Sequence, residues 1–420
     1  MVKAILSPGS KKAPSNKVYF SPHVLLSARI IAMKIVVSGM GYVGFSLLTL
    51  LGKDNDVTAI DPNKEKIRLL ENGCSPLSGE PFSIGQHIHP TTEIEAYKGQ
   101  ELAFVAVPTD YNEATKRLNT SVVDEVVGEI VKRSPDALIV IKSTVPIGYT
   151  LDARKRFSHS RIVFCPEFLR ESSYLEDVSR PSRIVIGAEE TEKETANELS
   201  QFLLRYVPAS TKVLHVSTGE AESIKLLSNA YLSLRVAFFN EVDNLSSERG
   251  YLTKNIIDGM SMDPRIGDYY NNPSFGFGGY CLPKDEKEAA SSFLDEKAGC
   301  LFASIDKSNE TRKDLIAEQI IKKGQGKTIG FYHIGKSNGK NSIRPTVTFD
   351  ILLRVLAKHK DILIYEPSLK LETFHGVEVV ASEDEFKKRS SIIVVDKIKK
   401  DLFDVKEKIF SSDQNQKLIL

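Results

Sequence analysis

Short hydrophobic runs alternate with longer amphipathic stretches from Met33 onward. The runs are rich in valine and isoleucine and lack a strict polar–apolar alternation. Such runs indicate strands that are buried on both faces, as in a parallel sheet covered by helices. In the first half of the chain, the runs that predict strands are 34–39, 56–61, 102–108, 137–144, 161–168, 183–188 and 212–217.

The pattern changes at residues 220–249, which contain neither glycine nor proline. Apolar side chains recur there every three or four positions, which predicts one long amphipathic helix. Ser217 and Glu220 fit a capping box at its start, and Gly250 fits its end. A helix of roughly 45 Å is typical of a domain linker or of a surface that packs against a second copy. The predicted apolar stripe is Ile224, Leu227, Tyr231, Leu234, Phe238, Val242 and Leu245.

Strand-like and helix-like runs alternate again after about residue 320, beginning with 327–334, 346–357 and 361–367. The expected fold class is therefore α/β, with two Rossmann-like doubly wound domains joined by a long central helix. The predicted divisions are an N-terminal extension over 1–32 and domains over 33–217, 218–320 and 321–420.

The composition of the 420 residues is that of a soluble globular protein, with a net charge of +1. This charge gives no bulk electrostatic case for binding nucleic acid or a membrane surface. No apolar run reaches the ~18–20 residues of a transmembrane helix. Residues 1–32 contain five Lys or Arg and no acidic residue, which resembles a transit peptide. Because Met33 opens the first predicted strand, we favour a disordered or non-native extension.

The four cysteines are Cys74, Cys165, Cys281 and Cys300. Their spacings match no zinc site or disulfide framework, so we expect free thiols and a cytoplasmic location. His87 and His89 are the only closely spaced histidines, and no cysteine or carboxylate cluster joins them in sequence. A metal site needs three or four convergent ligands, and we therefore predict none.

Glycines at positions 39, 41 and 44 form the pattern G-x-G-x-x-G between the first predicted strand and a helix. Asp61 ends the next strand. This context predicts a dinucleotide site, in which Gly39 makes the turn, Gly41 admits the pyrophosphate and Gly44 packs helix on strand. Asp61 would bind the ribose hydroxyls and repel a 2′-phosphate, which favours NAD over NADP. The alternative is a glycine turn without a ligand.

Two later strand ends carry candidate ligand contacts. Pro108 and Thr109 end one predicted strand, and Ser143 and Thr144 end another. In open α/β sheets ligands bind at this edge. The alternative for either threonine is a turn or helix cap.

Glycines also crowd into residues 275–279, directly before Cys281. A backbone poor in side chains can wrap a ligand and offer amides to its oxygens. Lys284 would lie close in a turn and favour the nucleophilic thiolate, and Asp285 adds a carboxylate. The alternative is a buried structural cysteine, which we expect for the other three cysteines.

A nicotinamide cofactor and a nucleophilic cysteine together suggest the oxidation of a primary alcohol to an acid. The first oxidation gives an aldehyde, which a thiolate captures as a thiohemiacetal. A second oxidation gives a thioester, and water releases the carboxylate.

The motifs "GMGYVG", "VPTD", "IKSTVPIG", "PEFLRE" and "NNPSFGFGGYCLPKD" resemble those of the nucleotide-sugar 6-dehydrogenases, the UDP-glucose/GDP-mannose dehydrogenase family, in its short bacterial type. The resemblance covers about residues 33–410. It implies the NAD-dependent, four-electron oxidation of UDP-glucose to UDP-glucuronate. It also implies an NAD-binding Rossmann domain, a homodimer built on the central helix, and a C-terminal domain that binds the UDP-sugar.

The catalytic residues that the resemblance implies are Cys281, Lys225, Asn229, Asp285, Glu171 and Thr144. Cys281 would be the covalent nucleophile, and Lys225 would stabilise developing oxyanions. Asp285 and Thr144 would hold a water for proton transfer, and Glu171 would be the base for thioester hydrolysis. From the sequence alone, Lys225 also fits a solvated helix lysine.

The remaining implied residues bind cofactor or substrate. For the cofactor they are Gly39, Gly41, Tyr42, Val43, Gly44, Asp61, Lys66, Pro108, Thr109, Ser143, Thr144, Glu171, Lys284 and Arg344. For the substrate they are Glu167, Phe168, Leu169, Arg170, Glu171, Lys225, Asn229, Arg265, Tyr270, Asn272, Ser274, Phe275, Gly276, Gly278, Gly279 and Lys336. Arg265 would reach the substrate of the neighbouring subunit. Arg344 lies about one residue later than the arginine in the family's motif, and the adjoining glutamate is missing.

Three alternative functions remain open from the sequence. The same chemistry fits another nucleotide sugar, such as UDP-N-acetylmannosamine or GDP-mannose. A one-hydride dehydrogenase would need no cysteine. A non-enzymatic NAD-binding protein would not need the catalytic residues that this chain retains.

Overall fold

The computed structural model describes residues 33–82, 85, 87–293, 299–335, 343 and 346–412. The extension 1–32, the last residues 413–420, Lys336 and Arg344 lie outside the described residues. The chain divides into two compact units. Unit 1 comprises Met1–Pro108, Val123–Ser143 and Thr150–Ala221, and unit 2 comprises Thr109–Val122, Thr144–Tyr149 and Glu222–Leu420. The three-domain division expected from the sequence stays a prediction.

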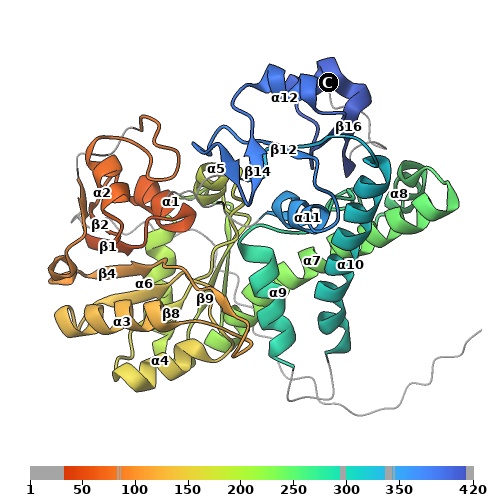
Figure 1. Ribbon diagram of the computed structural model, residues 1–420. Coiled ribbons are helices and arrows are strands. Elements are labelled where there is room, and N and C mark those ends of the chain that lie inside the picture. The colour runs from red at the N-terminus through yellow and green to blue at the C-terminus, as the bar shows by residue number, and fades with distance from the viewer. Residues whose placement is uncertain are drawn as a thin grey trace, which may run out of the picture. The chain divides into compact units, whose positions relative to one another are not determined.

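Unit 1 is built on an eight-stranded sheet with the order β10-β9-β8-β7-β4-β1-β2-β3 (Figure 1). Neighbouring strands are parallel, as predicted, except that β8 and β9 pair antiparallel. An antiparallel neighbour needs no long crossover, and only the short helix α5 separates these two strands. The strands are β1 Lys34–Ser38, β2 Asp56–Ile60, β3 Ile88–Thr91, β4 Leu102–Val105, β7 Leu138–Ile141, β8 Ile162–Phe164, β9 Arg183–Gly187 and β10 Lys212–Val216.

The centre of this sheet is buried on both faces, as the continuous apolar runs predict. Every residue of β4 and β7 is buried, and Ile35, Val36 and Val37 of β1 are completely inaccessible. This burial explains why these strands show no alternation. The helices of this part of the chain are α1 Tyr42–Leu51, α2 Lys64–Glu71, α3 Ser121–Arg133, α4 Tyr149–Phe157, α5 Tyr174–Ser179 and α6 Lys193–Leu203.

Unit 2 contains a second, smaller sheet with the order β13-β14-β12-β11-β15-β16. The pairs are parallel except β13 with β14. The prediction of a second α/β sheet in this region is confirmed. Its elements are β11 Ile329–Tyr332, α11 Val347–Leu356, β12 Ile362–Tyr365, β13 Thr373–Phe374, β14 Val377–Val379, α12 Glu383–Arg389, β15 Ile392–Val394 and β16 Ile409–Phe410.

The predicted long helix is α7, which spans Thr218–Arg249. Its capping box is present: Glu220 accepts hydrogen bonds from the Ser217 amide (2.9 Å) and hydroxyl (2.8 Å). Gly250 follows the last turn with φ 69°, a left-handed conformation that glycine adopts without strain. In the predicted stripe Tyr231, Phe238 and Leu245 are each more than half exposed.

Three further helices follow α7, namely α8 Thr253–Ser261, α9 Cys281–Ser291 and α10 Cys300–Lys323. Helix α10 packs against both α9 and α11 (Figure 1). Helix α9 begins at Cys281 itself, so Cys281 and Lys284 lie in its first turn. Pro283 is compatible with this helix because it lies in the first turn, where no amide is needed.

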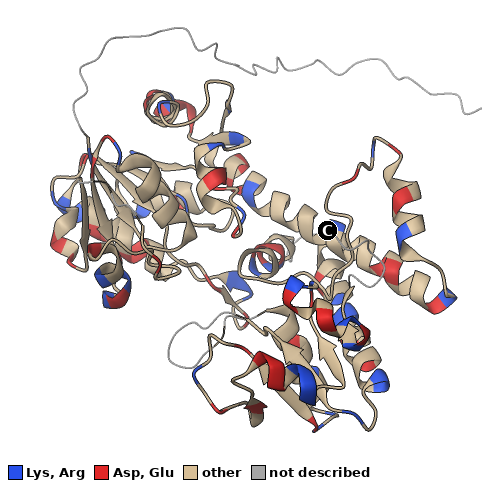
Figure 2. Cartoon of the chain, turned by 90° about the horizontal axis from the view of Figure 1, so that it is seen from above, with Lys and Arg blue, Asp and Glu red and all other residues tan. Residues whose placement is uncertain are grey.

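Acidic and basic residues are interspersed over both units (Figure 2). Within the described residues, no helix is long and apolar enough to span a bilayer.

Candidate functional site

The glycine fingerprint forms the turn between β1 and α1. Gly39 has φ 92°, and a Cβ atom there would lie 2.4 Å from the Ala106 carbonyl oxygen. A Cβ on Gly44 would lie 1.8 Å from the Gly39 carbonyl oxygen. By contrast, nothing lies within 4 Å of a Cβ placed on Gly41. Gly39 and Gly44 are therefore required by the fold, whereas the space above Gly41 fits a closely approaching dinucleotide.

Asp61 follows β2 and is 5% exposed. Its Oδ2 accepts hydrogen bonds from the Met40 amide at 2.8 Å and from Lys66 Nζ at 3.0 Å, and its Oδ1 accepts from the Asn63 amide at 2.9 Å. Asp61 therefore holds the glycine turn as well as offering a carboxylate. No side chain caps the start of α1 at Gly41, and its first turn has no acidic residue. This helix start is suited to phosphate groups.

The segment after β8 contributes the predicted substrate residues of unit 1. The Tyr42 hydroxyl, from the first turn of α1, donates to Glu171. Glu167 Oε2 accepts from the Leu169 amide at 2.6 Å, and Arg170 pairs with Asp177 at 2.6 Å. Two of these predicted residues are therefore fixed by partners within the same segment.

Glu167, Phe168, Leu169 and Arg170 line a pocket of about 310 Å³ in unit 1. Val43 of α1 lines it too. The sequence analysis missed three of its basic residues, Lys142, Arg180 and Arg183. Lys142 Nζ lies 3.5 Å from Cys165 Sγ and donates to the Pro166 carbonyl at 3.2 Å, and the Arg183 guanidinium stacks 3.8 Å from the Phe168 ring centre.

The two predicted strand ends are divided between the units. Pro108 and Ser143 belong to unit 1, where Ser143 Oγ donates to the Val107 carbonyl at 2.7 Å. Thr109 and Thr144 belong to unit 2, and both are buried. The Thr109 amide donates to the Tyr280 hydroxyl at 3.2 Å, next to Cys281 in the chain.

Cys281 is exposed at the first residue of α9. A helix N-terminus stabilises a thiolate. Asp285, one turn further on, is completely buried and accepts from Lys284 Nζ at 2.7 Å and from Asn229 Nδ2 at 2.6 Å. The charge of Lys284 is thus matched by Asp285. The structure brings Asn229 of α7 together with Asp285 of α9.

Lys225 of α7 is only 3% exposed, which excludes the solvated-lysine interpretation. One turn earlier, Glu222 is completely buried and accepts from the Gly148 amide at 2.5 Å. Glu222 was missed because a single helical glutamate carries no spacing signal. Its contact fixes the segment that contains Thr144.

Gly276 and Gly278 serve packing within the protein. Gly276 has φ 146°, and a Cβ there would lie 2.8 Å from Asn309 Oδ1. A Cβ on Gly278 would lie 2.4 Å from Val347 Cγ2. Only Gly279 of the three has open space around it. Neighbouring helices occupy the side-chain space of the first two glycines, which accounts for glycine there, and the ligand-binding role of all three stays a prediction.

The other predicted substrate residues of unit 2 differ in exposure. Arg265 is at the surface and pairs with Asp263 at 2.5 Å. Tyr270 is exposed with φ 54°, which is uncommon for tyrosine. Asn272 is exposed and Phe275 is completely buried.

Helix α9 also carries two buried acids that the sequence analysis missed. Glu288 accepts from the Leu118 amide at 2.7 Å and pairs with Arg117 at 3.3 Å. Glu286 is completely buried, and neither carboxyl oxygen has a hydrogen-bond partner among the described residues. Burial, with a smaller contribution from Asp306, raises the pKa of Glu286 to about 8. No periodicity distinguishes such acids from surface residues.

The remaining cysteines are unpaired thiols in the structure. Cys165 is buried, as expected of a structural cysteine, but Cys74 is half-buried and Cys300 is exposed. The buried interpretation is wrong for Cys300 because it is the first residue of α10 and faces solvent. His89 pairs with Asp56 at 2.7 Å, and no group of three metal-binding side chains occurs within the described residues.

A doubly wound sheet with a dinucleotide turn, and a helix that begins at an exposed cysteine, define a nicotinamide-dependent dehydrogenase. The sequence matches the NAD binding domain of the UDP-glucose/GDP-mannose dehydrogenase family over residues 33–203 and the family's central domain over 219–311. The chain belongs to this family, and NAD is its cofactor. The predicted resemblance is confirmed.

Two relatives and one solved structure show the extent of the likeness. The chain is 40% identical to UDP-glucose 6-dehydrogenase of Streptococcus pneumoniae, over 91% of this chain and 99% of the relative. It is 37% identical to UDP-glucose 6-dehydrogenase of Campylobacter jejuni, over 91% and 98%. A UDP-glucose dehydrogenase structure from Pyrobaculum islandicum shares the fold, with a TM-score of 0.76, 23% identity and coverage of 89% and 91%.

Proposed function

We propose that this enzyme oxidises UDP-glucose to UDP-glucuronate by two successive oxidations at the sugar's C6. The polar cluster at the start of α9 carries the proposal. In it the buried Asp285, one turn after Cys281, accepts hydrogen bonds from Asn229 and Lys284. The names of the two bacterial relatives supply the substrate. NAD, when bound, accepts one hydride in each oxidation, so each sugar consumes two NAD and loses four electrons.

The residues of the chain carry the covalent steps. The first oxidation leaves an aldehyde at C6, and Cys281 Sγ adds to its carbon to give a thiohemiacetal. The second oxidation turns this into a thioester, and water then breaks the C–S bond, releasing the carboxylate and restoring the thiol. An exposed Sγ at a helix start meets both needs, namely nucleophilicity and access.

We assign the proton and charge handling to the buried polar groups. Lys225 stabilises the alkoxide oxygens as they develop, and its burial strengthens that interaction. Asp285 and Thr144 hold a water for proton transfer, and Glu171 is the base for thioester hydrolysis. Glu167–Arg170, the loop 272–279 and Tyr270 bind the sugar nucleotide, with Lys336 contributing from the part of the chain outside the described residues. Arg344, which also lies outside them, is a proposed cofactor contact.

The cofactor side of the proposal rests on unit 1. The open space at Gly41 and the uncapped start of α1, with Tyr42, Val43 and Gly44, fit a pyrophosphate. Asp61 and Lys66 bind the ribose. Pro108, Thr109, Ser143 and Lys284 complete the proposed contacts.

We further propose a homodimer through α7. Tyr231, Phe238 and Leu245 lie seven residues apart and each exposes more than half of its surface in the single chain. A stripe of this kind is suited to a second copy of the same helix. Arg265, exposed beyond α8, is then available to the neighbouring subunit's substrate. The free thiols support a reducing, cytoplasmic location.

The test is the ratio of NADH formed to UDP-glucose consumed, followed by absorbance. Two NADH per sugar, and loss of turnover in Cys281→Ser with retained UDP-glucose binding, are expected. One NADH per sugar, or full turnover in the variant, would remove Cys281 from the mechanism. Turnover with UDP-N-acetylmannosamine or GDP-mannose but not with UDP-glucose would keep the chemistry and change the proposed substrate. The two bacterial relatives favour UDP-glucose.

A further inference from the structure

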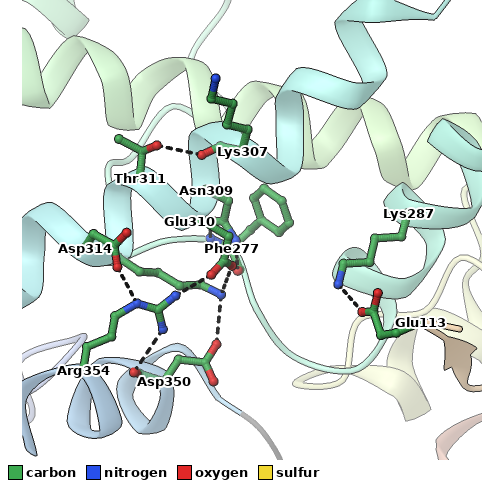
Figure 3. Close-up of polar contacts among 11 residues, drawn as sticks. Glu113, Phe277, Lys287, Lys307, Asn309, Glu310, Thr311, Asp314, Asp350 and Arg354 are labelled. Atoms are coloured by element: carbon green, nitrogen blue, oxygen red, sulfur yellow. Dashed lines mark hydrogen bonds and ion pairs between the residues drawn. The ribbon is translucent and has the colours of Figure 1, made fainter. Parts of the chain in front are cut away.

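The loop 272–279 is held in place by side chains from two helices. The Ser274 amide donates to Asn240 Oδ1 of α7 at 2.7 Å, and Arg312 Nε of α10 donates to the Ser274 carbonyl at 3.0 Å. Asn309 of α10 forms hydrogen bonds with both backbone groups of Phe277, the amide and the carbonyl. Its Oδ1 accepts from the Phe277 amide at 2.8 Å, and its Nδ2 donates to the Phe277 carbonyl at 3.0 Å (Figure 3).

The two hydrogen bonds from Asn309 restrict the conformational freedom of the loop 272–279. Asn309 is 2% exposed, so both hydrogen bonds are shielded from water. Its Oδ1 occupies the space where a side chain on residue 276 would lie, which explains the glycine there. Phe277 itself is buried with Ala237 of α7 and Ile305 of α10. The backbone of Phe277 is therefore held by α10, and its ring packs against both α7 and α10.

Ion pairs also fasten α10 to α11. Lys313 Nζ contacts Asp350 Oδ2 at 2.9 Å and Glu310 Oε1 at 2.7 Å. Arg354 Nε donates to Asp314 Oδ1 at 2.8 Å. Because several charges act together here, the contact is firmer than an isolated surface pair. Helix α10 thus links the second sheet's helix to the loop.

The loop's own amides fall into two groups. The amides of Ser274, Gly276 and Phe277 are already bonded within the protein. Those of Asn272, Phe275, Gly278 and Gly279 donate to no group in the described part of the chain. Holding residues 274–277 therefore determines where the neighbouring Gly278 and Gly279 amides point.

We propose that Asn309 and Arg312 are positioning residues, which fix the loop 272–279 in the shape that receives the sugar nucleotide. The inference rests on the proposed function, since that function makes this loop a substrate loop. Neither residue touches the reacting atoms; both act through the Ser274 and Phe277 peptides. Asn309 gives the sharper test, because Arg312 also forms a buried ion pair with Asp243 at 2.6 Å.

The experiment compares Asn309→Ala with Thr311→Ala. Thr311 lies on the same helix, but among the described residues its hydroxyl bonds only the Lys307 carbonyl of α10 (Figure 3). We expect Asn309→Ala to raise the KM for UDP-glucose by about tenfold to a hundredfold, the effect of losing two buried hydrogen bonds. The KM for NAD is expected to change less than about twofold, because unit 1 holds the dinucleotide turn. Thr311→Ala is expected to leave both constants unchanged.

Amide hydrogen exchange supplies a readout that does not depend on turnover. The peptide containing Phe277 is expected to exchange faster in Asn309→Ala and at the unsubstituted rate in Thr311→Ala. Asn309→Asp keeps an acceptor for the Phe277 amide and is expected to fall between them. The conservative variant thereby separates the two hydrogen bonds.

The outcomes are distinguishable. If the unsubstituted enzyme does not turn over UDP-glucose, the proposed function fails. If it does, and Asn309→Ala shows unchanged KM and unchanged exchange at Phe277, the positioning role is refuted. Equal increases in both KM values, with a lowered urea midpoint, would show a general structural role and also refute it.

Discussion

Replacing Glu286 by glutamine tests whether a neutral acid lies inside unit 2. The Glu286 carboxyl is completely buried on α9, and its pKa is raised to about 8, first by burial and then by Asp306. Lys287, which lowers that pKa, is itself paired with Glu113 at 2.5 Å. At neutral pH the folded protein therefore keeps this carboxyl protonated, and glutamine reproduces its shape and lack of charge.

The sign and size of the effect follow from linkage. Below the ordinary pKa of 4.5 the carboxyl is protonated in both states and has no effect on stability. As the pH rises, the unfolded state ionises first, so the free energy of unfolding falls until the pH reaches about 8. At about 1.4 kcal/mol per pH unit, the loss between about pH 5 and about pH 8 is up to about 4 kcal/mol. Glu286→Gln lacks this loss.

The assay is urea unfolding of both proteins at about pH 5, 6.5 and 8. The two midpoints are expected to be close at the lowest pH and to diverge steadily, with the variant more stable. Glu318→Gln is the control, because Glu318 lies exposed on α10, and its curve should parallel the unsubstituted protein. Parallel curves for Glu286→Gln would show that the buried carboxyl does not titrate as described, and would refute the reasoning.

Further substitutions test the cofactor turn and the exposed face of α7. Gly44→Ala is expected to destabilise unit 1 by about 1–3 kcal/mol, because its Cβ would lie 1.8 Å from a backbone oxygen. Gly41→Ala meets open space, so thermal unfolding should change little while NAD binding by calorimetry weakens about tenfold; equal Kd values would remove Gly41 from the cofactor site. Phe238→Glu is expected to convert a dimer into a folded monomer in sedimentation, since that side chain is 51% exposed in the single chain; a persistent dimer would exclude the α7 interface.

The fold was predictable where a local sequence pattern depends directly on burial. The β4 and β7 runs are continuous because both faces of the sheet are covered, and the observed strands confirm them. The start of α7 was also predictable, since Ser217 and Glu220 bond each other across one turn. The antiparallel pairing of β8 with β9 was not, because the strand signal contains no direction.

The site was predictable as residue types but not as contacts. The sequence does not show why a position is glycine. Only the structure shows whether a ligand or the protein itself occupies the space of a side chain. Gly41 faces open space, whereas Asn309 fills the space at Gly276. The same limit hid Asn309 itself and Glu286, because an isolated polar residue within a helix has no spacing that marks it as buried.

The carboxyl groups that follow Cys281 on α9 are either charge-balanced or protonated at neutral pH. Asp285 is paired with Lys284 and accepts a hydrogen bond from Asn229, and Glu288 contacts Arg117. Glu286 holds its proton at neutral pH. The proposed function requires a thiolate at Cys281, and with these charges balanced the field of the helix N-terminus would stabilise it. Removing Lys284 would leave a buried carboxylate one turn from the proposed nucleophile.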